Sequence, residues 1–414
     1  SLFIMDGLLQ EYKTGKKNLS SFKSSIILSA VTTIAGLGVL IFAKHPALRS
    51  IALISIIGIV CVVVMAQILI PFLFSVLIKN RVNKNRFPWT LWGFIKSSFA
   101  FSYFIGWSVT FTLMAWIFSL FNIKERGKLI YHNIICGVCR RLVYIMINVK
   151  KKIINPRLEK FETPAIIIAN HQSSLDILPL IMLHPKLIML TNNRIWNSLL
   201  FGKVIRMADY FPAEEIETDI SHVEDRVRNG YSIIIFPEGT RSEDGEIKRF
   251  HKGAFYLAEK LNVDILPIMI HGTDYTLTKQ DQLLKDGQLT VKILPRIRPG
   301  DNMFGNGYAE RAKHIGRYFR EEFGLLKQEI EQPKYFREKL IYNYLYKGPV
   351  LEWYMRIKTR LEKNYQPFHE LLPVQGRILD IGCGYGFMSY MLSFTSPQRE
   401  VTGIDYDEEK IETA

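Results

Sequence analysis

Two long apolar runs limit how this chain can fold more than any other feature of its sequence. Residues 26–43 and 50–78 contain no charged side chain. About 20 apolar residues of helix cross the hydrocarbon core of a bilayer, and a helix satisfies its own backbone hydrogen bonds there. The sequence therefore predicts two transmembrane helices. Small residues on both runs, Gly36 and Gly58 among them, favour close packing against further helices.

Basic residues flank these two runs unevenly. Residues 13–23 carry four lysines and residues 79–86 carry four cations, whereas the connecting residues 44–49 carry two. Cytoplasmic flanks of transmembrane helices are enriched in Lys and Arg. We therefore expect both outer flanks to lie in the cytoplasm and the short connection to lie outside.

A third apolar run, residues 97–123, is also uncharged. The segment that follows, 129–149, carries Arg140 and Arg141 in its middle, which is costly for a transmembrane helix. The sequence predicts that residues 92–149 form a helical hairpin that dips into the cytoplasmic leaflet, with a bend at Gly106 and its cations at the headgroups. A true third span is the alternative on hydropathy alone.

The positive charge of the chain is concentrated beside the apolar runs. The net charge is +14, and residues 79–160 hold 15 Lys and Arg against two acids, Glu125 and Glu159. Nucleic acid is one partner for such a block. An anionic membrane surface is the better one, because the same block contains long apolar runs. We therefore expect membrane lipids, and no nucleic acid, as partners.

The four cysteines are too few and too scattered for a disulfide framework. Cys136 and Cys139 form a CxxC pair, but the pair stands alone in an apolar helical segment. No group of His, Cys, Asp and Glu has the spacing of metal ligands. We expect no metal site.

From about residue 161 the pattern changes to short apolar strands that alternate with amphipathic helices. Strands are expected at 164–169, 186–191, 231–236, 264–270 and 289–294. This alternation predicts an α/β domain with a mixed sheet flanked by helices. A charged helical connector follows it.

The first polar motif, NHQSSLD, comes directly after the strand PAIIIA. In a regular helix His171 and Asp176 would lie about 140° apart and could not meet. They can meet if His171 lies on the loop and Asp176 on the first helical turn. A carboxylate on one imidazole nitrogen fixes the tautomer and leaves the other nitrogen free to accept a proton. This arrangement suits a general base that acts on an alcohol.

The second polar motif, FPEGTRS, stands at the end of another strand. Gly239 and Arg241 supply backbone N–H groups and a guanidinium, the donors that phosphate groups favour. Glu238 could bind a hydroxyl of the acceptor. Lys252, in FHKGAF, adds a second anion contact.

The order NHQSSLD, FPEGTRS, LPIMI resembles the PlsC-like glycerolipid acyltransferases, the lysophosphatidate acyltransferase class. The resemblance implies that His171 deprotonates the acceptor hydroxyl, with Asp176 orienting it. The hydroxyl then attacks the thioester of acyl-CoA or acyl-carrier protein, without an acyl-enzyme and without a cofactor. It also implies a substrate-binding set made of Asn170, Glu238, Gly239, Thr240, Arg241 and Lys252. Where the family carries a phosphate-binding Arg between these motifs, this chain reads MADYFPAEE. Lys203 or Arg206 could substitute, and the acceptor need not be ordinary lysophosphatidate.

A third motif, DIGCGYG, follows a strand and precedes a helix. An acid at the end of the next strand lies 19 residues beyond Gly386. The wording resembles class I S-adenosylmethionine-dependent methyltransferases, which implies a cofactor-binding set made of Asp380, Gly382, Gly384, Gly386 and Asp405. Only two βα units are present, so we expect a truncated Rossmann-like unit and no methyl transfer by this chain. A nucleotide fold that binds something else is the alternative.

Residues 32–74 resemble the last two membrane helices of exporters of the resistance-nodulation-division class, the MMPL-like branch, which implies further exporter helices as partners. The expected domains are an exporter-like helix pair, a basic membrane-associated hairpin, an acyltransferase domain, a helical connector and the start of a methyltransferase: residues 1–80, 81–160, 161–325, 326–372 and 373–414. The domains together predict a multi-pass protein of the bacterial cytoplasmic membrane, with its catalytic domain facing the cytoplasm. It would be a multifunctional O-acyltransferase that acts on a lipid hydroxyl. The alternatives are an acyltransferase of a specialised lipid or aryl-polyene-type pathway, or an exporter segment with an inactive acyltransferase-like domain.

Overall fold

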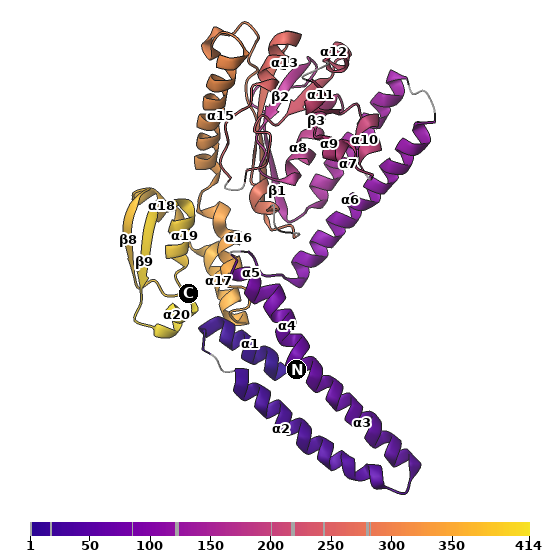
Figure 1. The fold of residues 1–414 in the computed structure, drawn as a ribbon. Helices are drawn as coiled ribbons and strands as arrows, with labels where there is room; N and C mark the ends of the chain where they lie inside the picture. The colour runs from indigo at the N-terminus through magenta and orange to yellow at the C-terminus, as the bar shows by residue number, and fades with distance from the viewer. Residues whose placement is uncertain are drawn as a thin grey trace. The chain divides into compact units, whose positions relative to one another are not determined.

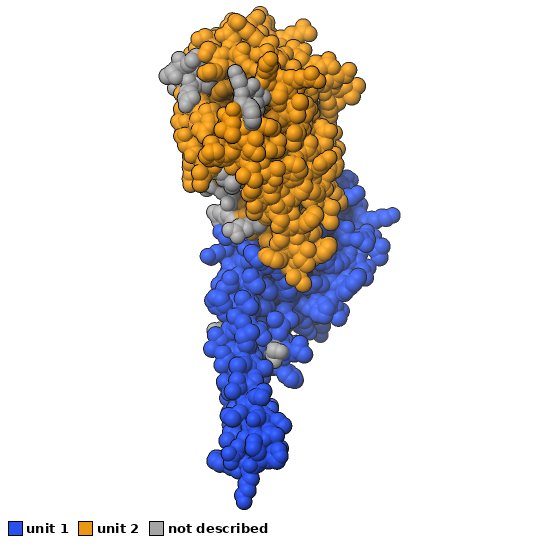
Figure 2. Space-filling model, turned by 90° about the vertical axis from the view of Figure 1, so that its right-hand side faces the viewer, with its two compact units in different colours: residues 1–89, 331–414 blue, residues 90–330 orange. Residues whose placement is uncertain are grey.

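The computed structural model describes residues 2–16, 19–84, 86–120, 124–199, 201–216, 220–242, 245–278, 281 and 283–414; the side chains of residues 215 and 216 are not described. The chain divides into two compact units, one formed by residues 1–89 and 331–414 and the other by residues 90–330, which Figure 2 shows in separate colours.

The first unit begins with long apolar helices. Helix α1 spans Leu2–Thr14, α2 spans Leu19–Gly38 and continues as a 3-10 turn to Phe42, and a longer helix begins with α3 at Pro46 and ends at Val82. Helices α2 and α3 lie side by side (Figure 1). No residue of α2 is buried, as expected of a helix surrounded by lipid or by other helices.

The long helix changes its hydrogen-bond pattern twice. The π-helical turns Met65–Leu69 and Ser75–Lys79 stand on either side of α4, Ile70–Phe74, which contains Pro71. Proline has no N–H to donate to the preceding turn, and π-turns are a common way to absorb such a break. The expected second span is thus helical throughout its length.

The second unit begins with the predicted hairpin. Helices α6, Leu91–Phe118, and α7, Glu125–Ile145, pack side by side (Figure 1). Within the described residues, α6 is the third helix long and apolar enough to cross a membrane. The reversal lies between α6 and α7 rather than at Gly106, since α6 is continuous through that residue. The last residues of the third apolar run, 121–123, lie outside the described residues.

The two hairpin helices use their surfaces differently. Helix α6 buries one narrow stripe, made of Ser97, Ala100, Ser108, Phe111 and Ala115, and exposes many of its other large apolar side chains. Helix α7 is amphipathic and buries seven residues, among them Tyr131 and Leu142. Arg140 on α7 donates to the carbonyl of Met182 at 3.0 Å. One of the two cations in the middle of α7 therefore has a hydrogen-bond acceptor within the protein.

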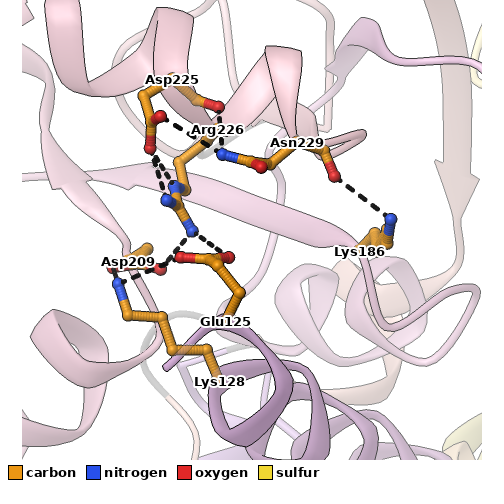
Figure 3. Close-up of polar contacts among 7 residues, drawn as sticks. All are labelled: Glu125, Lys128, Lys186, Asp209, Asp225, Arg226 and Asn229. Carbon is orange, nitrogen blue, oxygen red and sulfur yellow. Dashed lines mark hydrogen bonds and ion pairs between the residues drawn. The ribbon is translucent and has the colours of Figure 1, made fainter. Parts of the chain in front are cut away.

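A network of ion pairs ties the start of α7 to the rest of this unit (Figure 3). Buried Arg226, on α12 (Ser221–Arg228), donates to Glu125 at 2.9 Å and to Asp209 at 3.2 Å. Lys128 donates to the other oxygen of Asp209 at 3.0 Å. A buried cation is stable only when it is paired, and here several carboxylates meet it. Glu125, one of the two acids of the basic block, is thus used for anchoring.

The core of the second unit is a seven-stranded mixed sheet in the order β1-β7-β6-β2-β5-β3-β4. All neighbouring strands are parallel except β6 and β7. The strands are β1 Val149–Ile154, β2 Ala165–Ala169, β3 Leu187–Thr191, β4 Phe211–Pro212, β5 Ser232–Ile235, β6 Asp264–His271 and β7 Gly287–Ile293. All five expected strands are present, so the predicted α/β class with a mixed sheet is confirmed.

The two outer strands, β1 and β4, were not expected from the sequence. The strand β1 reads VKKKII and falls within the range assigned to the membrane hairpin, but it forms an edge of the sheet beside β7. Lysines are typical of edge strands because they oppose pairing with other chains. The central strand β2 is buried at every position. Helices α13, Gly253–Leu261, and α15, Tyr308–Ile330, pack over β6.

The C-terminal part of the first unit has its own small core. Strands β8, Gly376–Ile381, and β9, Arg399–Ile404, are parallel and are joined through α19, Phe387–Thr395. Helices α16, Pro333–Asn343, and α17, Pro349–Leu361, belong to the expected connector. Their residues Leu340 and Met355 share one hydrophobic cluster with Phe387 and Met391 of α19. The connector thus packs as part of the unit that contains the glycine motif.

Candidate active site

The histidine and the aspartate of the first motif meet as the sequence predicts. Nδ1 of His171 lies 3.0 Å from Oδ2 of Asp176. His171 lies on the loop after β2, and Asp176 ends the 3-10 turn Ser174–Asp176, where it forms a capping box with Ser173. A capping box closes the first turn of a helix tightly, which lets two residues five positions apart face each other.

Asp176 is held by three donors in addition to its contact with His171. It is fully buried, and its Oδ2 accepts the backbone N–H groups of Gln172 at 2.6 Å and Ser173 at 2.7 Å. The hydroxyl of Thr273, which follows β6, donates to Oδ1. These bonds fix the position of the carboxylate. Thr273 is a site residue that the motifs did not reveal, since it lies 97 positions away.

The His171 ring packs against the second motif. The Phe236 ring stacks on the imidazole with centroids 4.1 Å apart and planes 18° apart. The side chain of His171 is 18% exposed. Within the described residues no hydrogen bond occupies Nε2. The imidazole is therefore oriented from one side and open on the other.

Glu238 connects the two motifs through backbone hydrogen bonds. Its Oε1 accepts the N–H of His171 at 2.8 Å and its Oε2 accepts the N–H of Lys248 at 2.9 Å, and the residue is 3% exposed. Burial raises the pKa of the Glu238 carboxyl, and the two N–H donors oppose that shift. The predicted role was contact with an acceptor hydroxyl, but the structure places this carboxylate inside, as a clamp between two loops.

The turn after Glu238 is exposed and is backed by the next basic segment. Gly239 has φ +71°, and an added Cβ would lie 3.3 Å from the ring of His251. Gly239 and Thr240 are exposed, and Arg241 is partly exposed. The N–H of His251 donates to the carbonyl of Pro237 at 2.7 Å. The structure thus brings the turn formed by Gly239, Thr240 and Arg241 next to the segment that contains His251 and Lys252.

Asn170 lies in the interior instead of at the substrate edge. Its amide donates to the carbonyl of Ile270 and accepts the N–H of Ile270, both at 2.8 Å. The residue has no exposed surface. These two bonds join the ends of β2 and β6, and the predicted contact of Asn170 with substrate stays a prediction.

The stretch MADYFPAEE provides no free cation. Asp209, with φ +51°, is paired with Arg226 and Lys128. The two candidate substitutes for the missing Arg are engaged with aromatic rings: the ammonium of Lys203 lies 2.9 Å from the centre of the Trp116 ring, and the guanidinium of Arg206 lies 5.6 Å from that of Trp196. Glu214 is exposed.

Two family models match parts of this chain. Residues 146–271 match a family model described as Acyltransferase. This segment of the chain is therefore similar to the acyltransferase family. Residues 360–414 match a second family model, described as Methyltransferase small domain.

Two relatives that are similar to this segment are named as 1-acyl-sn-glycerol-3-phosphate acyltransferases. The chain is 32% identical over 142 residues to 1-acyl-sn-glycerol-3-phosphate acyltransferase LPAT1 of Arabidopsis thaliana, which covers 33% of this chain and 40% of that protein. It is 26% identical over 202 residues to 1-acyl-sn-glycerol-3-phosphate acyltransferase beta of Homo sapiens, covering 46% and 71%. The chain thus spans about two fifths of the length of the plant relative. A solved structure of PlsC, the 1-acyl-sn-glycerophosphate acyltransferase from Thermotoga maritima, aligns with a TM-score of 0.49 at 19% identity, covering 57% of this chain and 96% of that one.

The third motif forms a separate candidate site. Gly382, Gly384 and Gly386 all have positive φ, and Oδ2 of Asp405 accepts the N–H of Gly384 at 2.7 Å. The bonds from Asp407 and Gly384 lower the pKa of Asp405. Asp380 lies one strand earlier and accepts a bond from Ser389 at 2.6 Å.

A cavity of about 730 Å³ adjoins this turn and includes Gly382, Gly384 and Asp405 in its lining. Its size suits a nucleoside-type cofactor.

Among the described residues no group of three or more His, Cys, Asp and Glu could hold a metal ion. A larger cavity, about 790 Å³, is lined by Asn155, Arg296 and Asp264 among others. It lies where β6 begins, whereas His171 lies where the neighbouring strand β2 ends. The cavity and the histidine are therefore at opposite ends of the sheet.

Proposed function

We propose that this chain is a membrane-bound O-acyltransferase that moves an acyl chain from a thioester to a lipid hydroxyl. The observation that carries the proposal is the His171–Asp176 pair, with Nδ1 held at 3.0 Å and Nε2 open. The match to the acyltransferase family and the names of the relatives support it.

The geometry suggests how the reaction would proceed. Ionised Asp176 holds the proton on Nδ1, so Nε2 of His171 accepts the proton of the acceptor hydroxyl. The hydroxyl oxygen attacks the thioester carbonyl and forms a C–O bond. The C–S bond then breaks, and the leaving thiolate takes the proton back from Nε2. The ester and the free thiol are the products, and no acyl-enzyme is formed.

The acceptor is proposed to resemble a 1-acylglycerol-3-phosphate. Gly239, Thr240 and Arg241 would meet its phosphate, because they lie together on an exposed turn beside His171. The stretch MADYFPAEE offers no replacement for the missing Arg. A specialised lipid acceptor, as in an aryl-polyene-type pathway, is therefore the second candidate.

The remaining predictions extend this proposal to the whole chain. The three apolar helices would hold it in a bacterial cytoplasmic membrane, with the acyltransferase domain on the cytoplasmic side. The first two would be the end of an MMPL-like exporter, within a multifunctional protein. An exporter with an inactive acyltransferase-like domain is the opposing hypothesis, and the intact pair at His171 argues against it.

The glycine turn is proposed to hold S-adenosylmethionine. Gly382 and Gly384 would let the backbone approach the cofactor, and Asp405 would accept from its ribose hydroxyls. The positive φ values and the adjoining cavity fit such a group. The cofactor would supply a transferable methyl group when bound.

The deciding experiment uses membranes that contain this chain, labelled acyl-CoA or acyl-carrier protein, and a panel of lysolipids and hydroxylated lipids. We expect an ester product with at least one acceptor, and its loss in His171→Ala. Absence of any ester, or full activity of His171→Ala, would contradict the proposal. A product with lysophosphatidate alone would remove the specialised-lipid candidate.

A further inference from the structure

A group of basic side chains lies beside the exposed turn of the second motif, and the proposed acceptor phosphate does not use all of it. The group, called the basic rim below, consists of Lys248, Arg249 and Lys252. All three are exposed. Within the described residues, Arg249 and Lys252 have no hydrogen bond or ion pair. Glu243 and Asp244 lie outside the described residues.

The backbone of the rim is fixed to the site by several contacts. The buried carboxylate of Glu238 accepts the N–H of Lys248 and also the N–H of His171. The Lys248 ammonium donates to the carbonyl of Arg241 at 3.3 Å. The N–H of His251 donates to Pro237, and the His251 ring lies against Gly239. One carboxylate thus links the rim directly to the catalytic loop.

Arg249 and Lys252 are exposed cations that have no partner among the described residues. Lys252 stands at the N-cap of the nine-residue helix α13 and makes no side-chain capping bond. Exposed cations without an acid partner are available to bind phosphate. Helix α13 adds the positive end of its dipole in the same place.

One phosphate does not account for all of these cations. A phosphate monoester carries about two negative charges near neutral pH. Arg241 and the turn at Gly239 already provide the donors proposed for the acceptor phosphate. Two more free cations therefore point to a second phosphate-bearing substrate, and the reaction has one, since both common thioester donors carry phosphopantetheine.

We infer that the basic rim, through Arg249 and Lys252, binds phosphate of the phosphopantetheine thioester that donates the acyl chain. This inference rests on the proposed acyl transfer. The chemistry is shared by acyl-CoA, which carries additional phosphates on its nucleotide, and by acyl-carrier protein.

The test compares donors that differ in phosphate. Wild type, Arg249→Gln, Lys252→Gln and the double variant are assayed with acyl-CoA, acyl-carrier protein and an acyl thioester of N-acetylcysteamine, which has no phosphate. Lys260→Gln is the matched control, because it removes the same charge from the exposed last turn of α13. Thermal unfolding of each variant checks that the fold is retained.

We expect each single variant to raise the KM for acyl-CoA about tenfold, the usual size of a charge-assisted contact. In Arg249→Gln, the KM for the acceptor and the rate with the phosphate-free thioester should stay unchanged. A parallel rise with acyl-carrier protein would assign the rim to the shared phosphopantetheine phosphate. A rise with acyl-CoA alone would assign it to the nucleotide phosphates.

Two results would overturn the inference: a rise in the KM for the acceptor, or unchanged kinetics with every donor. Failure of the proposed function is seen separately, as a wild-type chain that forms no ester at all. Binding of free CoA by equilibrium dialysis then still tests the rim, because the double variant should bind it at least tenfold more weakly than wild type. Equal binding would reject the rim as a donor site.

Discussion

The turn after β2 and the turn after β8 both lead from a strand into a helix, but their surroundings differ. After β2, the turn with His171 and Asp176 is filled by the protein's own donors, and Phe236 and Glu238 pack against it. After β8, the turn with Gly382 and Gly384 has positive φ and open space where side chains would be. The first turn has its side chains held in place by contacts within the protein. The second leaves its backbone accessible to a ligand.

The comparison predicts the largest effects for the side chains of the first turn. His171→Ala removes the proposed base, and acyl transfer should fall at least about 10³-fold, within the range for loss of a general base. Asp176→Asn leaves the imidazole without its charged partner and should cost about 10²- to 10⁴-fold. Initial rates in detergent micelles measure both. Loss of less than tenfold in His171→Ala would place the chemistry elsewhere.

Glu238→Gln tests whether the first turn depends on its clamp. Both oxygens of the carboxylate accept N–H groups, and a glutamine would turn an NH₂ toward one of them. An unmet buried donor costs about 1–3 kcal/mol, so kcat should fall roughly 10- to 100-fold while the acceptor KM changes little. Glu259→Gln, an exposed change of the same charge, is the control. A large rise in acceptor KM without loss of kcat would restore direct substrate contact.

The position of Glu238 shows which features of the site could be predicted from the sequence and which could not. The two motifs and their positions at strand ends were readable, because strand periodicity and polar turns are local signals. The direction of a side chain was not readable. Glu238 and Asn170 both look like substrate ligands by type, yet each binds backbone groups of a distant part of the chain. Only the folded sheet reveals which backbone group each side chain meets.

The contact of Thr273 with Asp176 and the strand β1 were missed for the same reason. Thr273 reaches Asp176 from the end of β6, a contact set by the strand order. The strand β1 was hidden because VKKKII is too basic to read as a buried strand. It pairs with only one neighbour, β7, so its lysines can lie outside the core. Long-range pairing decides both cases, and a local pattern carries no information about it.

A matched pair of glycine variants tests the contrast in a single substitution. Gly239→Ala and Gly384→Ala both place a side chain at positive φ, with strain of about 1 kcal/mol. The new methyl group at 239 also meets the His251 ring at 3.3 Å, whereas the one at 384 meets nothing within 4 Å. Gly239→Ala should lower acyl transfer about tenfold. Gly384→Ala should leave acyl transfer unchanged and weaken binding of S-adenosylhomocysteine in calorimetry. Equal effects on acyl transfer would contradict the separation of the two sites.

The smallest expected effects are opposite pH dependences of stability at the two turns. The pKa of Glu238 is raised above 4.5 by burial, so its contribution to stability is present below pH 4.5 and is lost as the pH rises through the folded value. The pKa of Asp405 is lowered below 3.8 by backbone N–H donors, so its contribution is present above pH 3.8 and is lost as the pH falls through the folded value. Unfolding free energies of wild type, Glu238→Gln and Asp405→Asn measured from pH 3 to 7 check this, with ~0.5 pH spacing sufficient to resolve shifts of this kind. The difference between wild type and variant should shrink with rising pH for Glu238 and with falling pH for Asp405. The same direction in both would mean that the two carboxylates are held by their surroundings in the same way.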